Sequence, residues 1–516
     1  MNTAASDRVV VIGAGIGGLV AALELAAAGR EVVVLERAAA PGGKMRRVQV
    51  GGTAIDAGPT VFTMRWVFDE LFAAVGTTLA RHLTLTPLPT LARHAWADGS
   101  RLDLFADPEA SAAAISAFAG PAQAEGYRAF CERAQRIYRT LEQPFLRASR
   151  PSPVSLVQRV GLRHLPDLLA IAPFASMWAE IGRYFSDPRL QQLFGRYATY
   201  CGSSPWQAPA TLMLVAHVEQ QGVWAIQGGM HELATTLASL ATARSARLRC
   251  GEHVAQITHE RGRVSGVRLA SGERIEAGTV VFNGDAGALA AGLLGADVVR
   301  ASPPVYAHQR SLSALTWNVM APTSGFPLLR HNVFFSDDYH AEFTDVLQQG
   351  RLPANPTVYV CAQDREADTE PVPGRAERLL CLVNAPATGD TTPPSPQELA
   401  ACEARTFQML ERCGLQVMRE PQTTVRTTPQ DFERLFPATG GALYGRASHG
   451  WMASFSRPGA RSRLPGLYLA GGSTHPGPGV PMAALSGRQA ARSVLADRAS
   501  TPRFHPVATT GGTSTR

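Results

Sequence analysis

The stretch "RVVVIGAGIGGLVAALELAAAGREVVVLER", from Arg8 to Arg37, has the pattern of a strand, a helix and a second strand. Val9–Ile12 is a short, wholly apolar run of the kind that forms a buried parallel strand. Leu19–Ala28 is rich in Ala and Leu at helical spacing, and Gly29 can end that helix. Val32–Leu35 repeats the apolar strand pattern. The sequence therefore predicts a βαβ unit near its N-terminal end.

Glycines stand at the turn between the first strand and the helix, in the spacing G-x-G-x-x-G. Gly13 permits the tight turn, Gly15 lets a diphosphate approach the backbone, and Gly18 lets the helix pack closely on the strand. Glu36 ends the second strand, where a carboxylate accepts hydrogen bonds from an adenosine ribose. An isolated glycine motif is weak evidence, but one between a strand and a helix with this acid predicts a dinucleotide site.

The length and the charge of the chain limit the number of domains and the classes of partner that we expect. The chain has 516 residues, which is too long for one hydrophobic core and indicates two or three domains. Its formal net charge is +7. The basic residues are dispersed rather than grouped in blocks, which argues against nucleic acid as a partner and is compatible with an anionic membrane surface or with a plain solvated surface.

The cysteines and the apolar runs bear on metal sites, disulfide bonds and membrane spans. The seven cysteines include no C-x-x-C spacing, so we expect neither a metal site nor a disulfide framework, and a reducing cytosol is the simpler interpretation. We expect no secretory signal in the first residues and, because no run of 18 apolar residues occurs, no membrane span.

Further stretches carry a family resemblance. "ERAAAPGGK" (Glu36–Lys44) and "DAGPT" (Asp56–Thr60) resemble the second nucleotide-binding stretch of FAD-dependent amine oxidases and carotenoid desaturases. "GLYLAGGSTHPGPGVPMA" (Gly466–Ala483) resembles the C-terminal signature of the bacterial carotenoid desaturase family. The resemblance implies FAD as cofactor, and it implies contacts with FAD for Gly13, Gly15, Gly17, Gly18, Glu36, Arg37, Gly43, Lys44, Pro59, Thr60, Val254, Asn283, Gly471, Gly472, Gly479, Val480 and Met482.

A finer resemblance concerns the substrate. "LFGRYATYCG" (Leu193–Gly202) and "YVCAQDRE" (Tyr359–Glu366) are similar to the hydroxyneurosporene desaturase group of purple photosynthetic bacteria. This implies desaturation of the C3–C4 bond of an acyclic 1-hydroxy carotenoid by hydride transfer to flavin, giving a demethylspheroidene-type product in spheroidene or spirilloxanthin biosynthesis. Phytoene desaturation or another carotenoid desaturation or isomerisation is the alternative, followed by a flavin amine oxidase and a carotenoid carrier without enzymatic activity.

The resemblance also implies a fold of class α/β with α+β insertions. In that fold the Rossmann-like FAD domain is discontinuous in sequence. "RLRCGEHVAQITHERGRVSGVRLASGERIEAGTVVFNGD" (Arg247–Asp285) would return to it as a β-meander and a buried strand. The predicted parts are an FAD domain of 1–65, 225–300 and 455–500, a mixed-sheet substrate domain of 66–110 and 301–454, a helical subdomain of 111–224, and a disordered tail of 501–516.

Catalytic side chains are sparse in this interpretation. Because the flavin takes the hydride, the protein mainly binds and orients the substrate. His475, in the loop expected beside the flavin, is a candidate proton acceptor, although a role in ordering the loop is the alternative. Arg65 is a candidate for binding the 1-hydroxyl group, and a salt bridge to Asp69 is the alternative. We predict no metal ion.

A C40 carotenoid is held in membrane, so we expect the protein to dock on it as a monotopic, peripheral protein. Leu168–Ala179 is almost wholly apolar but too short to span a bilayer, and it could enter one leaflet or pack in a core. The expected location is the cytoplasmic side of the inner or intracytoplasmic membrane. Oxygen and a quinone are both open as the electron acceptor.

Overall fold

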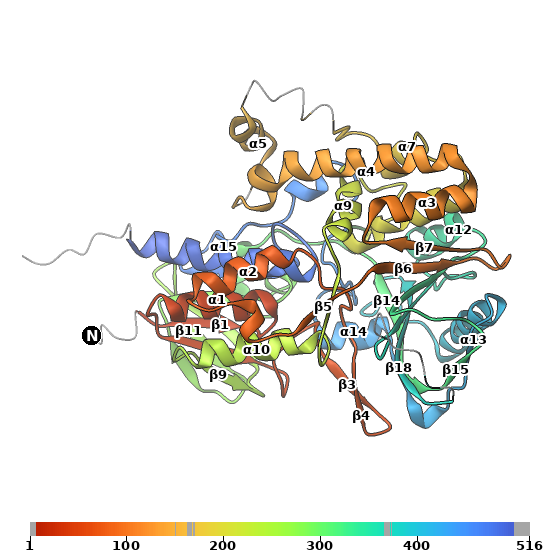
Figure 1. The fold of residues 1–516 in the computed structure, drawn as a ribbon. Helices are drawn as coiled ribbons and strands as arrows, with labels where there is room; N and C mark the ends of the chain where they lie inside the picture. Colours follow the sequence, from red (N-terminus) through yellow and green to blue (C-terminus); the bar gives the residue numbers. More distant parts are fainter. Residues whose placement is uncertain are drawn as a thin grey trace, which may run out of the picture.

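The computed structural model describes residues 7–149, 151–161, 168, 171–365, 372 and 374–499. The N-terminal βαβ unit lies in a five-stranded sheet of order β21-β13-β1-β2-β9, in which every neighbouring pair is parallel (Figure 1). These strands are β1 (Val9–Ile12), β2 (Val32–Glu36), β9 (Arg247–Cys250), β13 (Thr279–Phe282) and β21 (Leu467–Leu469). Three distant stretches of the chain therefore build one sheet, and the predicted α/β class is confirmed. The predicted tail, 501–516, lies outside the described residues.

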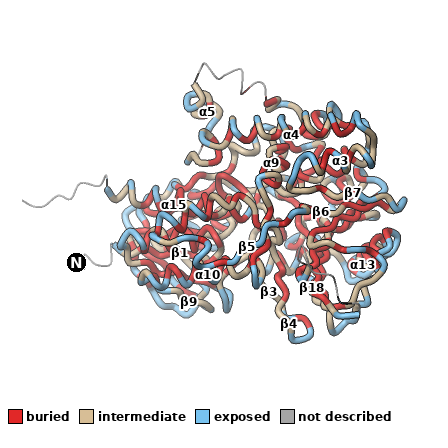
Figure 2. Tube along the Cα trace, in the orientation of Figure 1, coloured by how far each residue is buried: buried red, intermediate tan, exposed pale blue. Residues whose placement is uncertain are grey.

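The two faces of this sheet are covered by different elements. Val9 and Val11 share a buried core with helices α1 (Ile16–Ala27), α10 (His231–Thr242) and α15 (Val480–Ala499). Val10 and Ile12 point the opposite way, because side chains alternate along a strand, and pack on the antiparallel meander of β10 (Val254–Glu260), β11 (Arg263–Leu269) and β12 (Arg274–Glu276). The predicted meander is confirmed. Figure 2 shows the buried strands between these two layers.

A second sheet of seven strands, in the order β20-β14-β18-β17-β16-β6-β7, stands beside the first (Figure 1). Its neighbours are antiparallel except for the pair β16 and β6. The strands are β6 (Thr90–Ala95), β7 (Arg101–Phe105), β14 (Ser313–Ala321), β16 (His331–Phe334), β17 (Val358–Ala362), β18 (Glu377–Ala385) and β20 (Thr424–Thr427). Helix α13 (Pro396–Arg412), which starts with a Ser395–Glu398 capping box, covers one face through Phe407 and Leu410.

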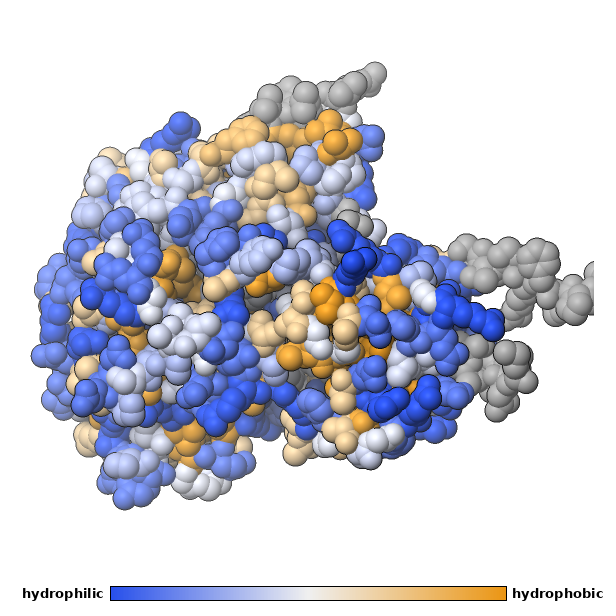
Figure 3. Space-filling view, turned by 180° about the vertical axis from the view of Figure 1, so that it is seen from behind, coloured by the Kyte–Doolittle hydropathy of each residue, from blue (hydrophilic) through white to orange (hydrophobic). Residues whose placement is uncertain are grey.

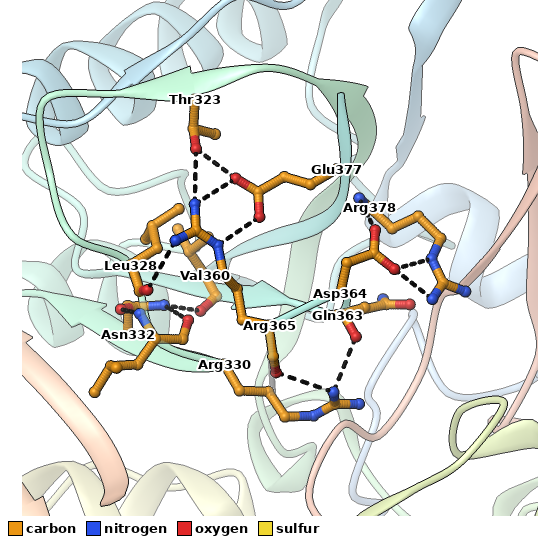
Figure 4. Close-up of polar contacts among 11 residues, drawn as sticks. Thr323, Leu328, Arg330, Asn332, Val360, Gln363, Asp364, Arg365, Glu377 and Arg378 are labelled. Carbon is orange, nitrogen blue, oxygen red and sulfur yellow. Dashed lines mark hydrogen bonds and ion pairs between the residues drawn. The ribbon is translucent and has the colours of Figure 1, made fainter. Parts of the chain in front are cut away.

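Polar contacts hold the end of this sheet where β17 and β18 are joined (Figure 4). Arg365 donates from Nε and Nη2 to the two carboxylate oxygens of Glu377, each at 2.8 Å, and both side chains are largely buried. Arg330 donates to the main-chain oxygen of Gln363 at 2.9 Å. The Gln363 side chain in turn donates to the main-chain oxygen of Asp56 at 2.8 Å, which ties this sheet to the hairpin of β3 (Arg47–Val50) and β4 (Thr53–Asp56).

The region predicted to be helical, 111–224, consists in its described part mainly of helices joined by turns, and its last residue, Trp224, begins a strand. Its helices are α3 (Pro108–Ala119), α4 (Pro121–Leu141), α5 (Pro153–Val160), α7 (Met177–Ile181), α8 (Pro188–Gly195) and α9 (Leu214–Gln220). Asp107 and Asp187 cap α3 and α8, each followed by Pro at the first helical position. Of the apolar segment 168–179, the structure describes residue 168 and residues 171–179. Among the described residues, no helix is both long enough and apolar enough to cross a membrane.

The remaining short elements connect these layers. The helices are α2 (Arg65–Ala74), α11 (Ala286–Ala290), α12 (Tyr339–Phe343) and α14 (Pro429–Leu435). The strands are β5 (Leu85–Pro87), β8 (Trp224–Ile226), β15 (Thr323–Ser324) and β19 (Gln416–Val417). The boundaries of the predicted domains stay a prediction.

Candidate functional site

A single cavity of about 1190 Å³ lies against both large sheets. At one end it is lined by the carboxyl ends of β1, β2 and β13, where loops leave a parallel sheet. At the other end it is lined by apolar side chains of the helical region and of the seven-stranded sheet, among them Leu141, Phe145, Leu156, Val215, Val218, Leu380 and Leu382. The cavity therefore joins the predicted dinucleotide end to a chamber with mainly apolar walls.

Glycines at the dinucleotide end leave no room for side chains. A Cβ atom on Gly17 would lie 2.7 Å from both the Gly471 nitrogen and the Asn283 Oδ1 atom. A Cβ on Gly18 would lie 2.1 Å from the main-chain oxygen of Gly13, which is the close helix–strand packing predicted for it. The start of α1 is therefore bare backbone, and its amide groups are available to an anionic ligand.

Polar side chains fix the loops around this helix start. Glu36 accepts hydrogen bonds from the amides of Ala14 at 2.7 Å and Ala38 at 2.8 Å, so its carboxylate is held beside the glycine turn. Asn283, just after β13, donates from Nδ2 to the main-chain oxygen of Gly13 at 3.1 Å. Strand β13 is thereby linked to the glycine turn, so that segments more than 250 residues apart form one wall.

Two cations line the same cavity, the half-buried Lys44 and the buried Arg457. Lys44, the only lysine in the sequence, donates to the main-chain oxygen of Leu443. Burial lowers the pKa of Lys44, and the charge of Asp285 opposes this. Arg457 donates to the main-chain oxygens of Tyr444 at 3.1 Å and Gly472 at 3.3 Å, and burial lowers its pKa to about 10. These groups suit an electron-rich ligand.

Sequence reasoning missed Arg457. Nothing in the local sequence distinguishes it from the neighbouring Arg446, Arg461 and Arg463, because only the fold brings it behind the loop of Gly472. It also missed Asp285 as a site residue. Asp285 lines the cavity, and its Oδ2 atom is buried without a hydrogen-bond partner among the described residues.

The structure brings the predicted contact residues together. With the exception of Gly18, which lies beneath the turn, every residue for which we predicted a contact with FAD lines the cavity: Gly13, Gly15, Gly17, Glu36, Arg37, Gly43, Lys44, Pro59, Thr60, Val254, Asn283, Gly471, Gly472, Gly479, Val480 and Met482. Their contact with a cofactor stays a prediction.

The two candidate catalytic residues are not among the lining residues. His475 is buried, and its Nε2 atom donates to the main-chain oxygen of Phe145 at 2.9 Å. Arg65 lies on the exposed side of α2 and forms an ion pair with Asp69 at 3.2 Å. These contacts are of the kind that we named as the alternative for each residue, and a catalytic role for either stays a prediction.

The cavity reaches the surface beside the helical region. Phe174 and Trp451 line it, and their exposed fractions are 69% and 41%. Their rings meet edge to face with centroids 5.2 Å apart. Figure 3 shows apolar surface at the top of the molecule, bordering the residues drawn in grey.

Solved structures share this fold. Putrescine oxidase bound to putrescine superposes with a TM-score of 0.58 and 15% identity, covering 95% of this chain and 99% of the oxidase. An oxidoreductase from Methanosarcina mazei gives a TM-score of 0.55 and 17% identity, covering 95% and 100%. At these identities the likeness concerns the fold alone.

Sequence relatives are much closer. The hydroxyneurosporene desaturase of Rubrivivax gelatinosus is 57% identical over 99% of this chain and 97% of its own length. The hydroxyneurosporene desaturase of Cereibacter sphaeroides is 47% identical over 96% of this chain and 99% of its own length. The family model described as flavin containing amine oxidoreductase matches residues 16–495. The protein is thus an oxidoreductase with a flavin cofactor, and the chain belongs to the flavin-containing amine oxidoreductase family and, within it, to the group of the hydroxyneurosporene desaturases.

Proposed function

We propose that this protein is an FAD-dependent desaturase that removes two hydrogens from the C3–C4 bond of an acyclic 1-hydroxy carotenoid. The observation that carries the proposal is the single cavity, in which a dinucleotide end and a chamber with mainly apolar walls are continuous. A polyene matches such a chamber, because its apolar surface gains about 25 cal/mol for each Å² removed from water. The full-length similarity to hydroxyneurosporene desaturases supports the same substrate class.

The residues at the dinucleotide end fit FAD. The bare start of α1 at Gly15 and Gly17 suits a diphosphate, and Glu36 keeps acceptor capacity for ribose hydroxyls while it holds the amides of Ala14 and Ala38. Lys44 and Arg457 supply positive charge further along the cavity. The stiff loop of Gly471–Gly479, with Pro476 and Pro478 in the wall, suits a flat ring system.

The reaction requires few catalytic side chains from the protein. When bound, the flavin supplies the acceptor for a hydride, while the second hydrogen leaves the substrate as a proton and a C=C bond forms. An oxidant of the oxygen or quinone class then takes up the two electrons that were removed from the substrate. The chain's own tasks are to align the polyene along the apolar wall and to keep bulk water away.

The substrate enters from a membrane in this proposal. Phe174 and Trp451 at the mouth of the cavity, with the exposed Val154 and Met452, offer an apolar surface for docking on a lipid headgroup layer. We propose a peripheral, monotopic association with the cytoplasmic side of the inner or intracytoplasmic membrane.

Anaerobic reduction of the bound flavin tests this function. Purified, FAD-loaded protein is mixed with detergent-dispersed 1-hydroxyneurosporene, phytoene or putrescine, and flavin absorbance and the carotenoid spectrum are followed. We expect the flavin to bleach with the hydroxylated carotenoid and the product spectrum to shift to longer wavelength, since each added double bond lengthens the chromophore. Bleaching by phytoene or putrescine alone would contradict the proposal.

A further inference from the structure

A group of polar side chains interrupts the apolar wall of the cavity. A set of five residues, here named the polar corner, lines the cavity: Arg196, Tyr200, Glu219, Tyr339 and Tyr359. Glu219 and Tyr339 are buried, and the other three are half-buried. They come from four separate parts of the chain, between residues 196 and 359. Polar groups are costly to bury beside an apolar ligand unless they are hydrogen-bonded, so each of them needs an explanation.

Most of the polar corner is satisfied internally. Glu219 accepts hydrogen bonds from the hydroxyl groups of Tyr200 at 2.5 Å and Tyr197 at 2.8 Å. The Tyr359 hydroxyl is hydrogen-bonded to Thr60 Oγ1 and to His331 Nδ1, each at 2.7 Å. These bonds hold the tyrosine rings in place and leave them little further hydrogen-bonding capacity.

Two members of the polar corner keep hydrogen-bonding capacity for a ligand. The Tyr339 hydroxyl is buried and has no hydrogen-bond partner in the described part of the chain. The Arg196 guanidinium lies 5.5 Å from the ring centroids of both Tyr200 and Tyr359, and it interacts with the Tyr200 hydroxyl and with the charge of Glu219. A guanidinium has five N–H donors, so donors remain for a ligand. A cation with spare donors and an unpaired hydroxyl in one cavity wall can both bind a polar group on the ligand.

The Tyr339 ring is firmly held in the same cavity wall as Arg196. Burial raises the pKa of Tyr339 well above its usual range, Glu342 adds to this, and the charge of Arg196 opposes it. The Tyr339 ring is fixed by Phe343 at 5.1 Å and Trp206 at 5.9 Å between centroids. The direction of its hydroxyl is therefore set by packing before any ligand arrives.

We propose that Arg196 and Tyr339 recognise the tertiary hydroxyl group of the substrate and thereby select the hydroxylated end of the carotenoid. The guanidinium donates a hydrogen bond to the hydroxyl oxygen, and the Tyr339 oxygen accepts the hydroxyl proton. This inference rests on the proposed function and names the residues that set its specificity.

The position of the polar corner in the cavity agrees with the reaction. In a 1-hydroxy carotenoid only the C2 methylene separates the carbon that bears the hydroxyl from C3, so anchoring the hydroxyl also positions the C3–C4 bond. The hydrogen bond from Tyr359 to Thr60 joins the polar corner to a residue of the predicted cofactor end. An anchor at this point would hold the reacting bond beside the cofactor.

The test compares two substrates that differ by the hydroxyl group alone, 1-hydroxyneurosporene and neurosporene. Anaerobic flavin reduction by each substrate is measured for the wild type, Tyr339→Phe and Arg196→Gln. We expect the wild type to favour the hydroxylated substrate, because a site built to hydrogen-bond a hydroxyl rejects the analogue that lacks it. Tyr339→Phe should lower kcat/KM for the hydroxylated substrate by roughly tenfold and leave the neurosporene value unchanged.

Tyr138→Phe is the matched control. Tyr138 also carries a buried hydroxyl without a hydrogen-bond partner among the described residues, but it does not line the cavity. This variant should keep the wild-type ratio of the two kcat/KM values. Flavin content and melting temperature are measured for every variant, and Tyr339→Phe, which removes one oxygen atom, decides the outcome if Arg196→Gln does not fold.

Three results would overturn the inference. An equal loss on both substrates in Tyr339→Phe would assign the residue a structural role only. A wild type that oxidises both substrates equally well would show that no hydroxyl is recognised, while the proposed desaturation would stand. A flavin that neither carotenoid reduces would refute the proposed function and the inference together.

Discussion

His475 Nε2 donates a hydrogen bond to the main-chain oxygen of Phe145, 2.9 Å away, and so ties the C-terminal glycine-rich loop to the turn that follows α4. The two rings also meet edge to face with centroids 5.0 Å apart. Phe145 lines the cavity, whereas His475 stands behind it. The histidine therefore supports the wall of the chamber.

Replacement of His475 tests this supporting role. In His475→Gln the amide nitrogen can still donate to Phe145, so we expect flavin binding and turnover to be retained. In His475→Ala the Phe145 oxygen loses this donor and keeps only the longer bond from the Ala148 amide at 3.3 Å, so we expect a cost of about 1 kcal/mol. Urea unfolding and flavin content measure both variants. A complete loss of turnover in His475→Gln with flavin still bound would favour a catalytic histidine.

Stability should depend on pH through the same residue. Burial lowers the pKa of His475 to about 4, with a smaller effect from the charges of Arg457 and Arg159, and the bond to Phe145 opposes this. Because the unfolded histidine titrates near pH 6.5, the unfolded state binds more protons between these values. Stability is then full above pH 6.5 and falls by on the order of 3 kcal/mol toward pH 4. Melting temperatures of wild type and His475→Gln should be similar above pH 6.5, and that of the wild type should fall below that of the variant toward pH 4.

Gly17→Ala should abolish flavin binding. The added methyl group would lie 2.7 Å from the Gly471 nitrogen and the Asn283 side chain, so the start of α1 and the loop after β21 would be forced apart. Flavin absorbance per polypeptide after refolding with FAD measures the loss. Gly182→Ala is the control, because its φ is −61° and its Cβ would meet atoms no closer than 3.6 Å. If Gly17→Ala retains flavin, the cofactor does not depend on this approach.

Lys44 can be examined chemically because it is the only lysine in the sequence. Since burial lowers its pKa, a larger share of the amine is uncharged at pH 8 than in an exposed lysine. We expect an amine-reactive reagent to label Lys44 in flavin-free protein and to spare it after FAD is added. Peptide mass spectrometry identifies the site, and the N-terminal amine serves as the internal control. Equal labelling with and without FAD would place the cofactor elsewhere.

Membrane docking should depend on the mouth of the cavity. Phe174→Ser combined with Trp451→Ser removes two exposed aromatic rings that meet there. We expect the double variant to bind vesicles of phosphatidylcholine and phosphatidylglycerol more weakly than the wild type in a flotation assay. Met418→Ser, which changes an exposed apolar residue outside the cavity lining, should float like the wild type. Loss of flotation in Met418→Ser as well would point to a nonspecific effect.

The dinucleotide end was predictable because the interactions that form it act between residues that are close in sequence. A short apolar strand, a glycine turn and an Ala-rich helix specify one another within 30 residues, and the structure places Gly13, Gly15 and Glu36 at the carboxyl ends of β1 and β2. The predicted meander also follows from a local pattern of alternating residues and tight turns. The role of Arg457 could not be predicted from sequence. Its side chain is placed by the contact with the Gly472 loop, and no pattern in the residues next to Arg457 indicates that contact.

The sequence by itself determined the α/β class, the glycine-bounded nucleotide end and the family. Only the tertiary structure decided that His475 faces Phe145 rather than the cavity and that Arg196 and Tyr339, 143 residues apart in the chain (339 − 196), share one apolar wall. The physical reason is the range of the interactions. Hydrophobic periodicity and turn chemistry act between near neighbours, whereas the placing of a buried polar group depends on the packing of elements distant in sequence.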